Sequence, residues 1–299
     1  MPALAQWAMR GPIEAAVLVV VFAVLSWYLP PLAYLAGAVV ALLAMQLDGG
    51  RALAVTAAAT AVLTLLSQLL LGSAVPGLVG ALLTLAPVAV LGDLVRRQGA
   101  LVVGLIGAGV VGMLLALAGW VLPADPPQWW LEQLRQFQEQ IQESASVDEL
   151  TPGQIQTLAV LMPGLVGMMS VIGMFISLIL GRWWQALLYN PGGFQRDFHA
   201  LSIGRGLALA LVVFAALGAT GMQMAANVAL AGAAAALFHG LAIVHALASR
   251  LPQGIWWLVP FYVLLVFMLP YMAVMLAVAG VLDTVLDFRR RGAGGDNAD

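Results

Sequence analysis

The chain has 299 residues, of which 63% are hydrophobic and only 9% are charged, with a formal net charge of −2. It contains no cysteine, which excludes disulfides, thiol nucleophiles and cysteine-ligated metal sites. A helix needs roughly 20 apolar residues to cross about 30 Å of hydrocarbon, and a mean hydropathy of +1.00 is typical of repeated crossings. The basic residues are all arginine, and with abundant Ala, Leu and Gly this suggests a GC-rich bacterial genome.

Apolar stretches separated by proline, glycine and charged residues follow one another along the whole chain. They predict an all-α transmembrane bundle of eight or nine spans, near residues 13–29, 32–47, 52–71, 75–91, 99–122, 157–180, 207–220, 222–248 and 255–282. The corresponding units are five spans in 1–122, an acidic extracytoplasmic segment at 123–156, a sixth span at 157–180, an aromatic cytoplasmic loop at 181–206, C-terminal spans in 207–288 and a polar tail at 289–299.

The distribution of arginines predicts the orientation of these spans. A cytoplasmic N-terminus places most connecting arginines inside and the acidic segment outside, as the positive-inside bias requires. These arginines are Arg51, Arg96, Arg97, Arg182, Arg196, Arg205 and Arg250. We therefore expect a multi-pass protein of a bacterial inner membrane. Nine simple crossings would leave Arg289 outside, unless Pro260 and Pro270 break the last segment or 207–220 does not cross.

The acidic segment contains an amphipathic helix. Asp125 can cap a helix that begins at Pro126, and Trp130, Leu134 and Phe137 then share one face. Together with Trp129, the aromatic residues Trp130 and Phe137 could form the apolar face of a lid over the bundle; the alternative is a connector on the membrane surface. Further on, Thr151, Pro152 and Gln154 resemble a capping box that opens the sixth span.

A polar stripe runs along the third span. Thr56, Thr60, Thr64 and Gln68 recur at helical spacing, so they should face the interior of the bundle and could line a site for a small polar solute. Alternatively, the threonine hydroxyls bond back to carbonyls of their own helix.

Small and polar residues elsewhere favour helix packing over chemistry. Residues 104, 108, 112 and 116 are alternately Gly and Ala, a smooth stripe that explains the local G-x-G-x-x-G pattern better than a nucleotide site does. Gln223 and Asn227 could bond a neighbouring helix or a ligand, and we expect the neighbouring helix. Asp48 and Asp93 are expected to pair with nearby arginines. His239 and His245 lie about 240° apart on a helix and do not converge on a metal. We expect no metal, no cofactor, no nucleic-acid partner and no enzymatic activity, because no catalytic motif is visible.

The loop after the sixth span is the most distinctive polar segment. It could dock another membrane protein, or it could be an interfacial aromatic belt followed by a turn. Its candidate docking residues are Arg182, Trp183, Trp184, Asn190, Arg196 and Asp197.

In this loop, in Gly240-Leu-Ala-Ile-Val-His245 and in the segment from Gly280 to Arg289, the chain resembles the YybS-like family of uncharacterised bacterial membrane proteins. That family is distantly similar to the S components of energy-coupling-factor transporters. The resemblance implies a six-helix core from the first six spans, an outward-facing solute site capped by external loops, and docking of an energising module on small-residue helix faces.

These observations lead to a primary prediction and an alternative. The primary prediction is an S-component-like bundle that binds or transports a small solute within the lipid bilayer. The alternative is a structural or assembly protein that docks other membrane proteins through small-residue helix faces and the 181–199 loop.

Overall fold

The computed structural model describes residues 2–47, 49–144 and 150–291, and this part of the chain is built from helices without any strand. The helices are α1 (Pro2–Ala8), α2 (Pro12–Leu25), α3 (Leu32–Gln46), α4 (Gly49–Leu71), α5 (Val75–Gln98), α6 (Leu101–Val121), α7 (Pro126–Ser144), α8 (Pro152–Tyr189), α9 (Gly193–His199), α10 (Gly204–Ala219), α11 (Gln223–Ala248), α12 (Gly254–Phe267), α13 (Leu269–Leu286) and α14 (Phe288–Arg291). The all-α prediction is confirmed.

Helix starts follow the local signals in the sequence. The side chain of Thr151 accepts from the Gln154 amide, and the Gln154 side chain accepts from the Thr151 amide, so the predicted capping box is present. Asp125 accepts a hydrogen bond from the Gln128 amide at the start of α7. Both predicted caps are confirmed.

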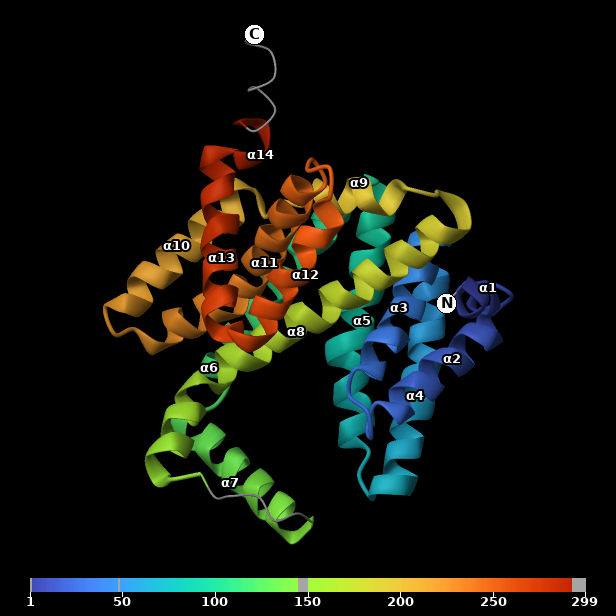
Figure 1. Cartoon of the computed structure of the whole chain (residues 1–299). Coiled ribbons are helices and arrows are strands. Elements are labelled where there is room, and N and C mark those ends of the chain that lie inside the picture. The colour runs from blue at the N-terminus through green and yellow to red at the C-terminus, as the bar shows by residue number, and fades with distance from the viewer. Residues whose placement is uncertain (1, 48, 145–149, 292–299) are drawn as a thin grey trace.

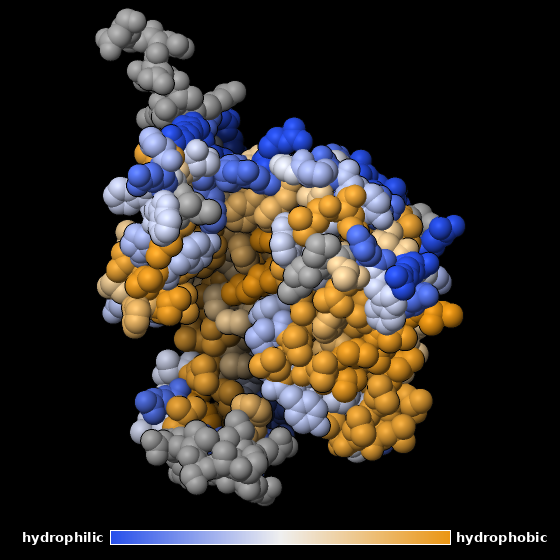
Figure 2. Space-filling view, turned by 45° about the vertical axis from the view of Figure 1, so that its right-hand side comes forward, coloured by the Kyte–Doolittle hydropathy of each residue, from blue (hydrophilic) through white to orange (hydrophobic). Residues whose placement is uncertain are grey.

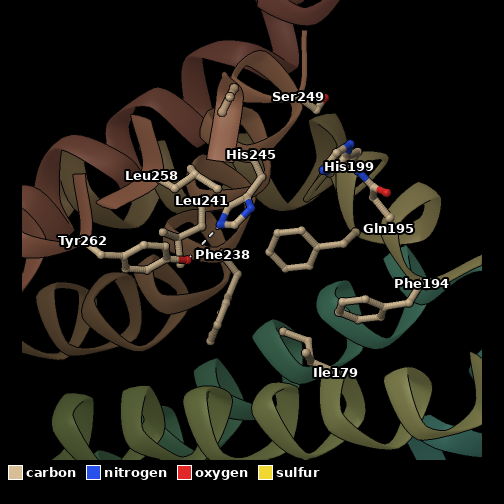
Figure 3. A pocket seen from close by; sticks show the side chains of 13 residues that line it. Ile179, Phe194, Gln195, His199, Phe238, Leu241, His245, Ser249, Leu258 and Tyr262 are labelled. Atoms are coloured by element: carbon tan, nitrogen blue, oxygen red, sulfur yellow. Dashed lines mark hydrogen bonds between the residues drawn. The ribbon is translucent and has the colours of Figure 1, made fainter. Parts of the chain in front are cut away.

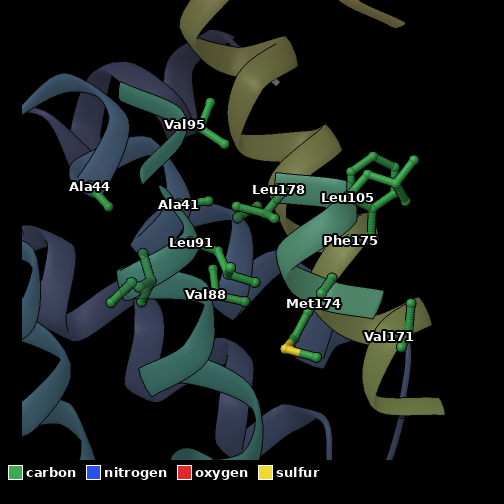
Figure 4. Packing of buried hydrophobic residues seen from close by; sticks show 14 of the residues in the cluster. Ala41, Ala44, Val88, Leu91, Val95, Leu105, Val171, Met174, Phe175 and Leu178 are labelled. Carbon is green, nitrogen blue, oxygen red and sulfur yellow. The ribbon is translucent and has the colours of Figure 1, made fainter. Parts of the chain in front are cut away.

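Helix α8 crosses the molecule and joins two groups of helices (Figure 1). Helices α2 to α5 lie on one side of it, and α6, α10, α11 and α13 lie on the other. Its central residues Met174, Phe175 and Leu178 are buried against Leu91 of α5 and Leu105 of α6 (Figure 4). The hydrophobic core therefore follows α8.

Small residues let the helices around α8 approach closely. A side chain at Gly112 of α6 would collide with Val171 and the Gly167 backbone of α8, and one at Gly181 of α8 would collide with Ala41 of α3. The predicted role of the Gly and Ala stripe in helix packing is confirmed.

Within the described residues, six helices are long and apolar enough to cross a bilayer, namely α4, α5, α6, α8, α11 and α13. Helices α9 and α10 meet at 44° and together would make a seventh crossing, whereas α2, α3 and α12 are apolar but shorter. This pattern fits a multi-pass integral membrane protein, while the count of eight or nine spans stays a prediction.

The last apolar segment is not one span. The segment predicted at 255–282 breaks at Met268 into α12 and α13, because Pro270 begins a new helix there. Arg250, before α12, donates to the main-chain oxygen of Arg289, after α13, at 2.6 Å. The two helices thus form a hairpin that returns the chain to the same end of the bundle (Figure 1).

The predicted loop 181–206 is also largely helical. Helix α8 continues to Tyr189 because Trp183 and Trp184 pack against the core, and Trp184 is completely buried. The chain turns only at Asn190-Pro191-Gly192 and then forms the short helix α9.

Polar contacts bring several arginine-bearing segments together at one end of the bundle. Gln185 near the end of α8 donates to Gln46 at the end of α3 at 2.9 Å, and Arg182 pairs with Asp197 of α9. Arg289 donates to the main-chain oxygens of His199 and Leu201. In Figure 2, hydrophilic residues gather over the upper end and apolar residues cover the flanks.

Candidate functional site

The predicted threonine wall does not open onto any of the four cavities described for this structure. Thr56, Thr60 and Thr64 each donate a hydrogen bond of 2.8 Å to the carbonyl four residues earlier in α4, which is the alternative set out from the sequence. Gln68 is exposed, and its amide lies 3.3 Å from the Gly72 oxygen. The hydroxyl hydrogens of the three threonines are thus used within α4, and a ligand-binding role of this stripe stays a prediction.

Of the three predicted lid residues, only Trp130 holds α7 against α6 and α8. Trp130 donates its indole N–H to the Gly119 oxygen at 3.2 Å, and Leu131 is buried with Ile155 and Ala159 of α8. Trp129 and Phe137 remain exposed, Phe137 by 59%. The packed face of α7 therefore comprises Trp130, Leu131 and Leu134, whereas Phe137, which the sequence placed on the same face, is exposed.

The predicted docking residues make internal contacts in most cases. Arg182 donates to Asp197 at 2.7 Å and to Gln185 at 3.0 Å, which ties the end of α8 to α9. Arg196 and Asn190 are exposed. For Asp93, pairing with Arg96 and Arg97 at 2.6 Å is confirmed, whereas Asp48 lies outside the described residues.

A different region contains a partly open space of a size suited to a small molecule. A cavity of about 550 Å³ lies between α8, α9, α11 and α12; we call it the His245 cavity (Figure 3). Its lining comprises Ile179, Phe194, Gln195, Phe198, His199, Phe238, Leu241, His245, Ala248, Ser249, Gly254, Leu258 and Tyr262. Ligand sites in proteins typically measure 300–1,000 Å³ and combine apolar walls with a few polar groups, as this cavity does.

One hydrogen-bonded pair provides the central polar feature of the cavity. The His245 Nε2 atom lies 2.8 Å from the Tyr262 hydroxyl, so the two rings join α11 to α12 across the space. The Phe198 ring meets the His245 imidazole edge-on, with centroids 5.3 Å apart. The imidazole is therefore oriented by an aromatic ring on one side and a phenol on the other.

A buried ionic network positions the α9 wall of the cavity. His239 Nε2 lies 3.0 Å from Asp283 Oδ2, and Arg289 donates to the same oxygen at 3.0 Å. Arg289 also donates to the main-chain oxygens of His199 at 2.7 Å and Leu201 at 2.9 Å. Because His199 ends α9, the network connects α11 and α13 to the helix that covers the cavity.

The backbone conformation at the end of α13 explains how Arg289 comes close to Asp283. Asp287 has a φ of 48° and ends α13 in the left-handed region, which aspartate tolerates better than most residues. The chain then turns so that the Phe288 amide donates to Asp283 Oδ1 at 2.7 Å and Arg289 reaches back to Asp283. Buried ionisable groups within a membrane bundle are costly unless paired in this way.

Helix α12 forms the least enclosed wall of the cavity. Gly254 is buried at its start, but the other side chains described for α12 are exposed or only half-buried, and Phe267 is 84% exposed. Pro260 inside the helix removes one backbone hydrogen-bond donor. On this side the cavity is bordered by a helix that packs weakly against the rest of the bundle.

Neither the sequence pattern nor the comparisons with known proteins point to this cavity. The sequence drew attention to His245 only as a possible metal ligand and as part of the family resemblance, and it gave no signal for Tyr262. Among the described residues, no three His, Asp or Glu side chains gather closely enough to hold a metal ion. No family model, curated protein or solved structure matches the chain.

Proposed function

We propose that this integral membrane protein binds a small amphipathic molecule in the His245 cavity. The observation that carries the proposal is the cavity itself, whose aromatic and aliphatic walls surround the His245–Tyr262 pair. Apolar walls bind the body of such a ligand, and the imidazole, the phenol and the Gln195 amide offer hydrogen bonds to its polar group.

The arrangement of helices supports entry of this ligand from the membrane. The cavity lies next to α12, whose outward side chains Trp256, Val263 and Phe267 are exposed and apolar. An amphipathic molecule in the bilayer could therefore reach the cavity along this exposed apolar face. The cavity is also at the end of the bundle where Arg182, Arg250 and Arg289 lie. The positive-inside bias assigns that end to the cytoplasm, together with the N-terminus and Arg289.

This proposal retains solute binding as the function and changes its location from the Thr56 stripe to the His245 cavity. Transport of the bound molecule, an energising partner and membership in the YybS-like family stay predictions from the resemblance. We place the assembly alternative second, because Arg182 and Asp197, two of the proposed docking residues, already pair with each other.

The proposal is tested by filling the cavity. Leu241→Trp adds an indole to the lining, and Leu209→Trp adds the same group to an exposed position on α10. Mass spectrometry of small molecules extracted from the purified proteins should find a species in the wild type and in Leu209→Trp that is missing from Leu241→Trp. That compound should also stabilise the wild type by about 2.7 kcal/mol at 100 times its dissociation constant.

Two results would argue against the proposal. The first is an identical set of bound molecules in all three proteins. The second is a compound that stabilises Leu241→Trp as strongly as it stabilises the wild type, because that compound must bind elsewhere. Tyr262→Phe provides a finer test, since it preserves the shape of the wall and removes the phenol oxygen that pairs with His245.

A further inference from the structure

Flat side chains follow one another along the wall of the His245 cavity. Phe194 meets Phe198 of the same helix with ring centroids 5.9 Å apart, and Phe198 meets His245 of α11 at 5.3 Å. His245 in turn meets Tyr262 of α12 at 5.9 Å. Rings from three helices therefore border one space (Figure 3). Such walls complement a planar ring, because aromatic rings attract one another edge to face or in offset stacks.

No side chain with a fixed charge lines this cavity. Within the described residues, its lining contains no Asp, Glu or Arg. Asp197 of α9 pairs with Arg182 instead. Asp283 of α13 is held by Arg289. An ionic group that entered the cavity would meet no opposite charge on its walls, and burial of an unpaired ion is costly. The walls therefore favour a neutral ligand.

The polar groups of the cavity offer hydrogen-bond donors from two walls. A neutral imidazole has one N–H and a phenol has one O–H, and the 2.8 Å contact between His245 and Tyr262 uses one of these two donors. Whichever ring donates, the other donor of the pair stays available for a ligand. The Gln195 amide supplies two N–H groups from α9, and Figure 3 shows it on the opposite side of the space from Tyr262. A ring with an acceptor atom at each end satisfies both walls.

We infer that the His245 cavity binds the ring of a lipid-soluble quinone, and this inference rests on the function proposed above. The planar ring lies among the aromatic side chains, and its two carbonyl oxygens accept hydrogen bonds from the His245–Tyr262 pair and from Gln195. The apolar tail extends into the bilayer beside α12, where Val263 and Phe267 are exposed. A fatty alcohol lacks the ring and an alkylbenzene lacks the oxygens, so each of them matches only part of the site.

The inference is tested by titrating the purified full chain in phosphatidylcholine nanodiscs with decylubiquinone and measuring the quenching of tryptophan fluorescence. Leu241→Trp fills the cavity and reports the background from quinone dissolved in the bilayer, whereas Leu209→Trp carries the added indole at an exposed position on α10. The wild type and Leu209→Trp should show saturable quenching that Leu241→Trp lacks. Decylbenzene has the same tail and a planar ring without carbonyl oxygens. As a competitor it should bind about 25-fold more weakly than the quinone, because each of two lost hydrogen bonds accounts for about fivefold.

A double variant tests the donors of the ring pair. His245→Phe combined with Tyr262→Phe keeps both rings and removes every N–H and O–H group of the pair. It should weaken quinone binding about fivefold and leave the binding of decylbenzene unchanged. Tyr271→Phe is the matched control, because it removes a phenol from an exposed position on α13 outside the cavity lining. Circular dichroism confirms that each variant is folded before it is compared.

Three results would overturn the inference. They are equal affinities of the wild type for decylubiquinone and decylbenzene, equal quinone affinities of the double variant and Tyr271→Phe, and saturable quenching of Leu241→Trp. The proposed function is judged separately, by the molecules extracted from the wild type and from Leu241→Trp. If these molecules differ while decylubiquinone fails, the cavity binds a ligand of another class. If they are the same, the proposed function fails and the quinone inference falls with it.

Discussion

Replacing Gly240 with alanine tests a close contact between α11 and α13. A Cβ at this position would fall on the Leu276 carbonyl oxygen of α13 and lie 2.7 Å from its carbonyl carbon. Carbon atoms normally approach to 3.5–4.0 Å, so α13 must move away from α11 by roughly 1 Å. Overpacking of this kind costs about 1–3 kcal/mol.

The same displacement weakens the buried ionic network. It would stretch the 3.0 Å contact between His239 and Asp283 to roughly 4 Å, beyond hydrogen-bond range. A polar contact between membrane helices contributes about 0.6 kcal/mol on average. We therefore expect Gly240→Ala to lower the free energy of unfolding by about 2–3 kcal/mol. Titration with sodium dodecyl sulfate, followed by circular dichroism, measures this change.

The control for this prediction is Gly80→Ala. Gly80 is also helical, but a Cβ there meets no atom within 4 Å. Alanine has a higher helix propensity than glycine, so this variant should be as stable as the wild type or more stable. If Gly240→Ala unfolds at the same detergent fraction as Gly80→Ala, the tight contact between α11 and α13 is not present and the reasoning is wrong.

Two further predictions concern contacts between distant parts of the chain. Asn227 accepts from the Gly164 amide at 2.7 Å and donates to the Val160 oxygen at 2.9 Å. Asn227→Leu should therefore lower the free energy of unfolding by about 1–2 kcal/mol in the same assay, while Gln223→Leu should be nearly neutral. Equal effects of the two substitutions would contradict the bridging role of Asn227. The chain has no cysteine, so Met268→Cys and Ser249→Cys can each be labelled on their own with an impermeant maleimide. The α12–α13 hairpin predicts that the two cysteines are labelled from opposite sides of the membrane. Labelling of both from the same side would refute the hairpin.

These contacts confirm the interhelical role predicted for Asn227. They also join two backbone atoms of α8. Gly164 N and Val160 O are the two atoms that an ordinary α-helical hydrogen bond joins, and Pro163 lies directly beside them. The Asn227 side chain connects both atoms from α11. The polar residue in an apolar span therefore predicted a hydrogen-bond partner on another helix, but the sequence did not show which helix supplies that partner.

The sequence by itself determined the features that depend on short distances along the chain. Apolar length predicts membrane helices, and residues such as Asp125, Pro126 and Thr151 mark helix starts because a cap acts within three or four positions. The stripe through Gly112 predicts close packing because glycine leaves room for another backbone. The threonines of α4 stayed ambiguous, since a hydroxyl can face a ligand or its own helix with equal ease.

Only the tertiary structure decided the site. His245 of α11 meets Tyr262 of α12 across the turn that joins these helices, and Arg289 reaches His199 from 90 positions away. The hairpin of α12 and α13 decided which end of the bundle Arg289 occupies. Such contacts depend on how helices fold back on one another, and hydropathy or local spacing carries no information about which distant helix faces become neighbours.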